Sequence, residues 1–277
     1  MSACETAPPL LHHVAAGGGE TVLLLHGSAS TSAFWRRLIE ALQPLYRVIA
    51  PDLIGYGQSS LRPADAPHGL EAEIRTLKSL LPCCDGGYHL AGHSYGGVVA
   101  LMLALSAPTR VRTLTLIEPV FFAALRHRGD EASFRDFQAV RDRFVSMVGR
   151  GAVETALQDF VGFWTGAASW ERMPAEMRGA MLQNAGRITR DWQASFAANA
   201  DSRDLAALGP RTLLLAGVGS PAPMLRLVEA LHRLMPGSRR EIVPRAGHLL
   251  PITHVSAVSR AVLDHLDAAA KRRSAGE

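Results

Sequence analysis

The segment Gly92-His93-Ser94-Tyr95-Gly96 decides how this chain folds. It lies between an apolar strand predicted over 88–91 and an apolar helix predicted over 96–106. A serine at so sharp a strand-to-helix turn needs neighbours without a Cβ, because larger side chains would clash with the backbone. The helix N-terminus behind the turn offers N–H groups to a developing negative charge. The segment therefore favours a nucleophilic Ser94 over a merely tight turn.

Two phosphate-binding loops are alternatives for this glycine-rich segment. The spacing of Gly92, Gly96 and Gly97 does not fit the dinucleotide pattern G-x-G-x-x-G. No Lys-Ser or Lys-Thr pair follows, as a P-loop requires. The sequence therefore indicates no nucleotide cofactor at this turn.

Strands and helices alternate on both sides of the segment. Short apolar runs predict strands, of which the first is the weakest, over 10–14, 21–25, 46–50, 88–91, 111–117, 212–216 and 240–243. Amphipathic or apolar patterns predict helices over 32–42, 70–81, 96–106, 224–234 and 255–270. Such alternation implies right-handed crossovers and an α/β fold with a mostly parallel sheet flanked by helices.

Only helical patterns occur between 119 and 205, so we expect a helical insertion there, with the α/β core formed by 1–118 and 206–277. The aromatic residues gather in this insertion. It holds eight of the 9 Phe and three of the 4 Trp. The charged residues of the insertion mostly fall between apolar ones, and we expect them to be solvated.

The composition excludes several classes of protein. Of 277 residues, 48% are hydrophobic and 19% charged, which is too apolar for a disordered chain. The length fits a single α/β domain that carries an insertion. The net charge is +4, and no stripe interleaves basic with aromatic residues, so we expect no nucleic-acid partner. The basic segment 271–273 is interpreted as a solvated terminus.

Membrane, metal and redox features are also lacking in the sequence. No apolar run reaches about 18 residues, so we expect no membrane partner, and 1–11 lacks the pattern of a signal peptide. Cys4, Cys83 and Cys84 have no zinc-site spacing. We therefore expect a reduced, cytoplasmic protein without metal or cofactor that acts on a small molecule. The sequence indicates no oligomeric state.

Motifs along nearly the whole chain resemble those of the α/β-hydrolases. In order, they are His26-Gly27-Ser28, the stretch 51–59 (Pro51-Asp52-Leu53-Ile54-Gly55-Tyr56-Gly57-Gln58-Ser59), the serine turn and Gly247-His248. Several motifs in the right order are more specific than any one alone. The resemblance implies an α/β-hydrolase fold of the serine-nucleophile branch, with 119–205 as a helical cap over the active site.

Four of the 11 histidines are candidates for the base that a serine nucleophile needs. His248 follows the last predicted strand, where the resemblance implies the catalytic histidine. His254 is expected at the start of a helix. His93 lies beside Ser94 and cannot easily turn onto it, so we expect a packing role, and His26 is expected to orient the neighbouring loop.

The acid departs from the family's usual pattern. In the turn Gly217-Val218-Gly219-Ser220-Pro221, Ser220 stands where the resemblance implies an aspartate. No Asp or Glu occurs over 205–228, so Glu118, at the end of the preceding strand of the sheet, is the best substitute. The alternatives are that Glu118 is a strand-end residue without a catalytic role or that a Ser–His dyad works alone. Asp52 is expected to cap its own loop.

An oxyanion hole is expected from two backbone N–H groups, those of Tyr95 and Ser28. The Ser28 side chain is a further, weaker candidate donor. With Ser94, His248 and Glu118 these residues predict a carboxylic ester hydrolase that works through an acyl-enzyme.

Other reactions occur on similar frameworks: hydrolysis of a carbon–carbon bond, hydroxynitrile cleavage and cofactor-free perhydrolysis. A ligand receptor that kept the fold is disfavoured by the Ser–His pair. Dehalogenation or epoxide hydrolysis is disfavoured because the nucleophile position holds a serine. The aromatic residues of the insertion either pack on one another or line an apolar substrate pocket, the candidates being Phe121, Phe122, Phe163, Trp164 and Trp170.

Overall fold

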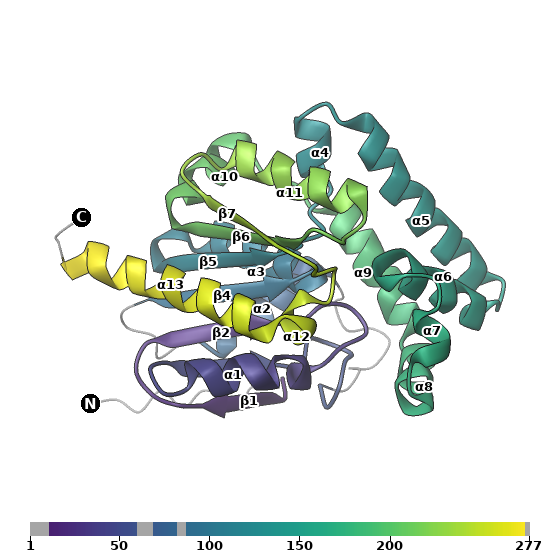
Figure 1. The fold of residues 1–277 in the computed structure, drawn as a ribbon, viewed down its shortest axis with the longest axis horizontal. Helices are drawn as coiled ribbons and strands as arrows, with labels where there is room; N and C mark the ends of the chain where they lie inside the picture. Colours follow the sequence, from purple (N-terminus) through teal and green to yellow (C-terminus); the bar gives the residue numbers. More distant parts are fainter. Residues whose placement is uncertain (1–10, 60–68, 82–86, 275–277) are drawn as a thin grey trace.

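The structure is a computed structural model that describes residues 11–59, 69–81 and 87–274. The three cysteines lie outside these residues, so the expectations about them stay predictions. A seven-stranded sheet in the order β1-β3-β2-β4-β5-β6-β7 forms its centre (Figure 1). The strands are β1 (His13–Ala16), β2 (Thr21–Leu25), β3 (Arg47–Pro51), β4 (Tyr88–His93), β5 (Val111–Ile117), β6 (Thr212–Gly217) and β7 (Arg239–Val243).

All neighbouring strands pair in parallel except β1 and β3, which pair antiparallel at one edge. The predicted α/β fold with a mostly parallel sheet is confirmed. The first strand, predicted over 10–14, is described from His13 to Ala16, and residue 10 lies outside the described residues.

Helices cover both faces of the sheet. Alternate residues of a strand point to opposite faces, so the central strands contribute side chains to both layers of the core. In β2, Val22 and Leu24 pack toward α1 (Arg36–Leu42) and α13 (Val255–Ser274). Leu23 and Leu25 belong to the core on the other face. The helices on that side are α2 (Leu70–Ser79), α3 (Tyr95–Ser106), α10 (Ser202–Leu208) and α11 (Ala222–Leu234).

Short elements complete the core. They are η1 (Ser32–Trp35), η2 (Pro108–Arg110), η3 (Gly209–Arg211) and α12 (Leu250–Thr253). The helix predicted over 32–42 therefore starts as a 3-10 turn, and α12 has no counterpart in the predictions. In the described part of the chain, no helix combines the length and apolarity that crossing a bilayer requires.

The helical insertion follows β5 and lies beyond one end of the sheet (Figure 1). Its helices are α4 (Ala123–His127), α5 (Glu131–Gly149), α6 (Val153–Thr165), α7 (Ser169–Arg172), α8 (Ala175–Gln183) and α9 (Ala185–Ala197). Helix α9 packs on α3, and α4 and α5 pack on α11. The predicted boundary at 205 falls inside α10, which packs on α3 and α11.

The strand order reverses between β2 and β4, because the chain passes from β2 to β3 on one side and then to β4 on the other. In open α/β sheets, ligands bind outside the carboxyl ends of the strands at such a switch point. Ser94 and the loop 26–28 follow these two strands.

Candidate active site

Ser94 occupies the sharp turn between β4 and α3. Its backbone angles are φ 54° and ψ −119°, a left-handed conformation that is strained for a residue with a side chain. A Cβ at Gly92 would lie 2.2 Å from the carbonyl oxygen of Gly96, and one at Gly96 would lie 2.3 Å from that of Leu25. Only glycines therefore allow the strand and helix to approach closely enough to hold Ser94 in this turn.

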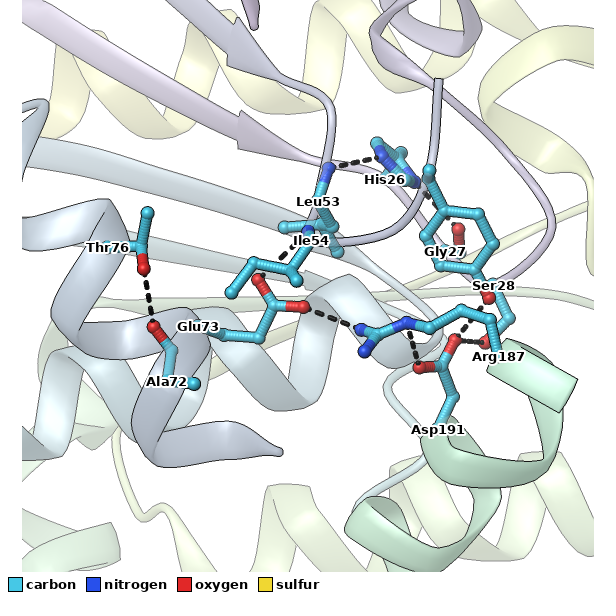
Figure 2. Close-up of polar contacts among 11 residues, drawn as sticks. His26, Gly27, Ser28, Leu53, Ile54, Ala72, Glu73, Thr76, Arg187 and Asp191 are labelled. Carbon is cyan, nitrogen blue, oxygen red and sulfur yellow. Dashed lines mark hydrogen bonds and ion pairs between the residues drawn. The ribbon is translucent and has the colours of Figure 1, made fainter. Parts of the chain in front are cut away.

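The loop 26–28 lies directly against Ser94. A Cβ at Gly27 would be 3.1 Å from the Cβ of Ser94. The His26 ring fixes the loop, because its Nε2 accepts from the backbone N–H of Leu53 at 2.9 Å and its Nδ1 donates to the carbonyl of Gly27 at 2.8 Å (Figure 2). This arrangement needs a neutral imidazole, and burial lowers the pKa of His26 to about 4.

His248 and Glu118 are in contact at the carboxyl ends of β7 and β5. Nδ1 of His248 lies 2.7 Å from Oε2 of Glu118, which is fully buried. The other carboxylate oxygen, Oε1, accepts the N–H of Gly217 at 2.8 Å and the hydroxyl of Ser220 at 2.5 Å. Ser220 thus donates a hydrogen bond to the carboxylate that approaches from the neighbouring strand.

His93 and Asp52 have supporting contacts. The His93 ring stacks on Phe34 at 5.0 Å, and its Nε2 donates to the backbone carbonyl of His248 at 2.8 Å. Burial holds the pKa of His93 well below its ordinary value. Asp52 accepts from the backbone N–H groups of Ser32 at 2.6 Å and Gln58 at 2.9 Å. These two hydrogen bonds lower its pKa against the opposing effect of burial, so Asp52 braces its own loop.

A cavity of about 360 Å³ lies beside Ser94 and His248, between the sheet and the insertion. Its apolar lining includes Phe34, Phe160, Val161, Trp164, Met173, Met177, Met181, Leu249 and Ile252. A smaller cavity, about 20 Å³, borders Ser28, Ser94 and Asp191. Trp164 lines both the cavity of about 360 Å³ and a third one of about 530 Å³, and its ring stacks on the imidazole of His248 with 4.1 Å between ring centres.

The five aromatic candidates for the substrate pocket divide by position. Trp164 lines the cavity beside Ser94, and Phe163 lines the third cavity. Phe121, Phe122 and Trp170 line none of these three cavities and are buried in the hydrophobic core. Phe122, for example, stacks on Trp192 with 5.6 Å between ring centres. Their surroundings favour packing, the alternative that the sequence left open.

Sequence reasoning missed several residues of the site. Phe160 and the methionines of α8 line the cavity beside Ser94, but nothing in an amphipathic helix pattern distinguishes an apolar residue that faces a pocket from one that is packed. The expectation that the charged residues of the insertion are solvated is wrong for Arg187 and Asp191, which are 5% and 2% exposed. Packing of α9 on α3 buries both side chains.

Comparisons with known proteins agree with this architecture. The profile of the alpha/beta hydrolase family matches residues 22–261. Lipase LipV of Mycobacterium tuberculosis is 39% identical over 99 residues, which are 35% of this chain and 36% of the lipase. The 2-hydroxymuconate semialdehyde hydrolase of Pseudomonas sp. is 37% identical over 100 residues, 35% of either chain. The alignments therefore span about a third of the length of these curated relatives.

A solved structure covers more of the chain. A thermophilic esterase from Thermogutta terrifontis superposes with a TM-score of 0.71 and 27% identity over 94% of this chain and 93% of that one. The family profile extends across both halves of the sheet and through the insertion, over a span that includes Ser94, Glu118 and His248, each of which follows the carboxyl end of a strand. The chain belongs to the α/β-hydrolase family.

Proposed function

We propose that this chain is a serine hydrolase that cleaves a small, apolar carboxylic ester or similar acyl substrate through an acyl-enzyme. The observation that carries the proposal is the contact between His248 and Glu118 beside a cavity that Ser94 also lines. Because Glu118 holds Nδ1, the Nε2 nitrogen of His248 is the one available to take a proton.

The proposed reaction has two halves. His248 removes the proton of Ser94 as the serine oxygen attacks the carbonyl carbon, and Glu118 stabilises the imidazolium that forms. The backbone N–H groups of Ser28 and Tyr95 bind the oxyanion. The tetrahedral intermediate collapses, His248 returns the proton to the leaving alcohol, and water activated by His248 then hydrolyses the acyl-enzyme.

We further propose that the insertion 119–205 is a cap that selects the substrate. Residues of α6 and α8, with Met173 between them, supply most of the apolar lining of the cavity beside Ser94, and Trp164 stacks on the His248 ring. Such a lining, with few polar groups, suits an apolar acyl or alcohol group of moderate size.

Hydrolysis of a carbon–carbon bond is the second candidate. The match to the 2-hydroxymuconate semialdehyde hydrolase favours it, and the same serine, histidine and carboxylate would serve. A panel of p-nitrophenyl esters set against a meta-cleavage product separates the two candidates, because each predicts turnover of a different substrate.

Labelling by a fluorophosphonate tests the nucleophile. We expect the parent chain to gain one covalent adduct on Ser94, detected by mass spectrometry, and Ser94→Ala to gain none and to lose ester turnover. Ser106→Ala, at the far end of α3, is the matched control and should behave as the parent. Labelling of Ser94→Ala at the parental rate would refute the proposal.

A further inference from the structure

Helix α9 of the insertion carries a buried pair of charges that reaches into the core. Arg187 Nη2 donates to Glu73 Oε1 of α2 at 2.6 Å, and Arg187 Nε lies 3.1 Å from Asp191 Oδ1 (Figure 2). This second contact is an ion pair without hydrogen-bond geometry. Neither Nε of Arg187 nor Oδ1 of Asp191 has a hydrogen-bond partner among the described residues. The side chains of Glu73, Arg187 and Asp191 are all almost completely buried.

Asp191 continues this chain of contacts to the loop after β2. Its Oδ2 accepts the hydroxyl of Ser28 at 2.6 Å and the hydroxyl of Tyr56 at 2.6 Å. A serine hydroxyl has one proton to donate. In this arrangement the Ser28 hydroxyl therefore donates to Asp191 and does not supply a third bond to an oxyanion. The backbone N–H of Ser28 keeps that role.

Arg187 contacts the other residue of the proposed oxyanion hole. Its guanidinium carbon lies 5.6 Å from the ring centre of Tyr95 and 5.3 Å from that of Tyr56. A cation over an aromatic ring is attracted by the negative face of the ring. Asp191 and Arg187, one turn apart on α9, thus contact the side chains of Ser28 and Tyr95 respectively.

We propose that Asp191 and Arg187 are positioning residues of the oxyanion hole, which they hold from the insertion through the side chains of Ser28 and Tyr95. The inference rests on the proposed function. It gives the insertion a second task beside covering the substrate, because contacts from α9 add to those by which His26 fixes the 26–28 loop.

Stability alone is a weak reason for this network. Replacing a buried ion pair by packed apolar residues is often neutral or stabilising, since desolvation offsets the attraction between the charges. Placement of an oxyanion donor is far more demanding, because displacement by about 1 Å can lower a rate about 100-fold. The network contacts both donor residues from one helix, Ser28 through a hydrogen bond of 2.6 Å and Tyr95 through a cation–π contact of 5.6 Å.

Asp191→Asn is the first test, because it keeps the shape and removes the charge. We expect kcat for a p-nitrophenyl ester to fall about 10- to 100-fold, since one lost oxyanion donor costs about 100- to 1,000-fold, with KM little changed. The rate of fluorophosphonate labelling and the affinity for a trifluoromethyl ketone should fall in parallel, because both place an oxygen in the oxyanion hole. A purely structural residue would lower Tm without moving these readouts together.

Ser28→Ala is the second variant and keeps the backbone N–H and the buried ion pair. We expect it to lower kcat in the same way, and Asp191→Asn combined with Ser28→Ala to be no worse than Asp191→Asn alone. Asp159→Asn is the matched control, because Asp159 pairs with Arg143 at 2.6 Å on the exposed side of the insertion. Its kcat, labelling rate and inhibitor affinity should equal those of the parent.

The outcomes are distinguishable. If the parent neither turns over an ester nor reacts with the fluorophosphonate, the proposed function fails and this inference fails with it. If the parent reacts but Ser28→Ala and Asp191→Asn keep its kcat and inhibitor affinity, only the positioning role is refuted. Should Asp191→Asn not fold, Ser28→Ala decides alone.

Discussion

Glu118 contacts His248 from a strand end other than the one where the resemblance implies the acid. It has a positive φ of 45°, so the backbone turns sharply at the end of β5 and directs the carboxylate toward the loop that carries His248. Its two oxygens accept three hydrogen bonds, from His248, Gly217 and Ser220. Ser220, on the strand end where the resemblance implies an aspartate, donates a hydrogen bond to the Glu118 carboxylate.

The proximity of Glu118 and Ser220 predicts that the acid can be moved. Glu118→Ala should lower kcat about 1,000- to 10,000-fold, because the imidazole loses the group that fixes its tautomer. Adding Ser220→Asp should restore part of that loss, since the Ser220 oxygen lies 2.5 Å from the Glu118 carboxylate that contacts His248. Steady-state ester hydrolysis measures both variants.

Ser220→Ala in the Glu118→Ala background is the control and should restore nothing. A double variant with Asp at position 220 that stays as inactive as Glu118→Ala would contradict the prediction. Ser220→Asp alone should be impaired, because two carboxylates so close would compete for one proton.

Helices α3 and α9 each contain a glycine, and the surroundings of the two glycines differ. Gly96 lies where α3 passes the end of β2, and an added Cβ would meet backbone oxygen atoms at 2.3 Å. Gly186 lies on the exposed side of α9, and an added Cβ would meet nothing within 4 Å. Glycine is required at position 96 of α3, whereas glycine at position 186 lowers the stability of α9.

The same substitution should therefore change stability in opposite directions. Gly96→Ala should destabilise by about 3 kcal/mol or move Ser94 out of its turn, because rigid backbone cannot yield to overpacking. Gly186→Ala should stabilise by about 0.5–1 kcal/mol, because alanine loses less conformational freedom in a helix. Urea unfolding followed by circular dichroism measures both, and equal effects of the two variants would contradict the argument.

Elements with one strong local signal were predictable from the sequence. The apolar run over 111–117 became β5 with the same bounds, and the glycines around Ser94 predicted the turn. Glu118 was predicted because Ser220 stands where the resemblance implies the acid and Glu118 lies at the end of the preceding strand of the sheet, and its catalytic role stays a prediction. Arg187 and Asp191 were missed, since an Arg–Asp pair four residues apart usually marks an exposed helix face. Only the packing of α9 on α3 in the folded chain distinguishes this buried pair from an exposed one.

At the scale of the whole molecule, one hydrophobic core joins the sheet to the insertion. Buried residues from Leu23 of β2 to Trp192 of α9 belong to the same cluster. The Glu73–Arg187 ion pair crosses the same boundary. The insertion is thus joined to the core by apolar packing and by a buried charge, and the stability of this junction should depend on pH.

Burial raises the pKa of Glu73 from 4.5 to about 7, with Asp191 adding to the rise and Arg187 opposing it. Between these pH values the folded chain keeps a proton that the unfolded chain has lost. Stability should therefore fall as pH rises through this window, by up to about 1.4 kcal/mol per pH unit. Glu73→Gln should remove this contribution, measured as the difference in unfolding free energy from the parent between pH 4.5 and 8.

Glu71→Gln is the control for this pH dependence, because Glu71 lies exposed in the first turn of the same helix. It should keep the parental slope. If Glu73→Gln also keeps the parental dependence of unfolding free energy on pH, Glu73 does not bind its proton more tightly in the folded chain than in the unfolded chain.

The stacking of Trp164 on His248 gives the molecule an internal optical reporter. The indole lies against the imidazole with 4.1 Å between ring centres and also lines the cavity beside Ser94. Indole emission responds to the charge of a neighbouring ring and to the polarity of its surroundings. One of the 4 tryptophans in the chain therefore lies against both His248 and this cavity, and we expect a ligand that enters the cavity to change the tryptophan fluorescence.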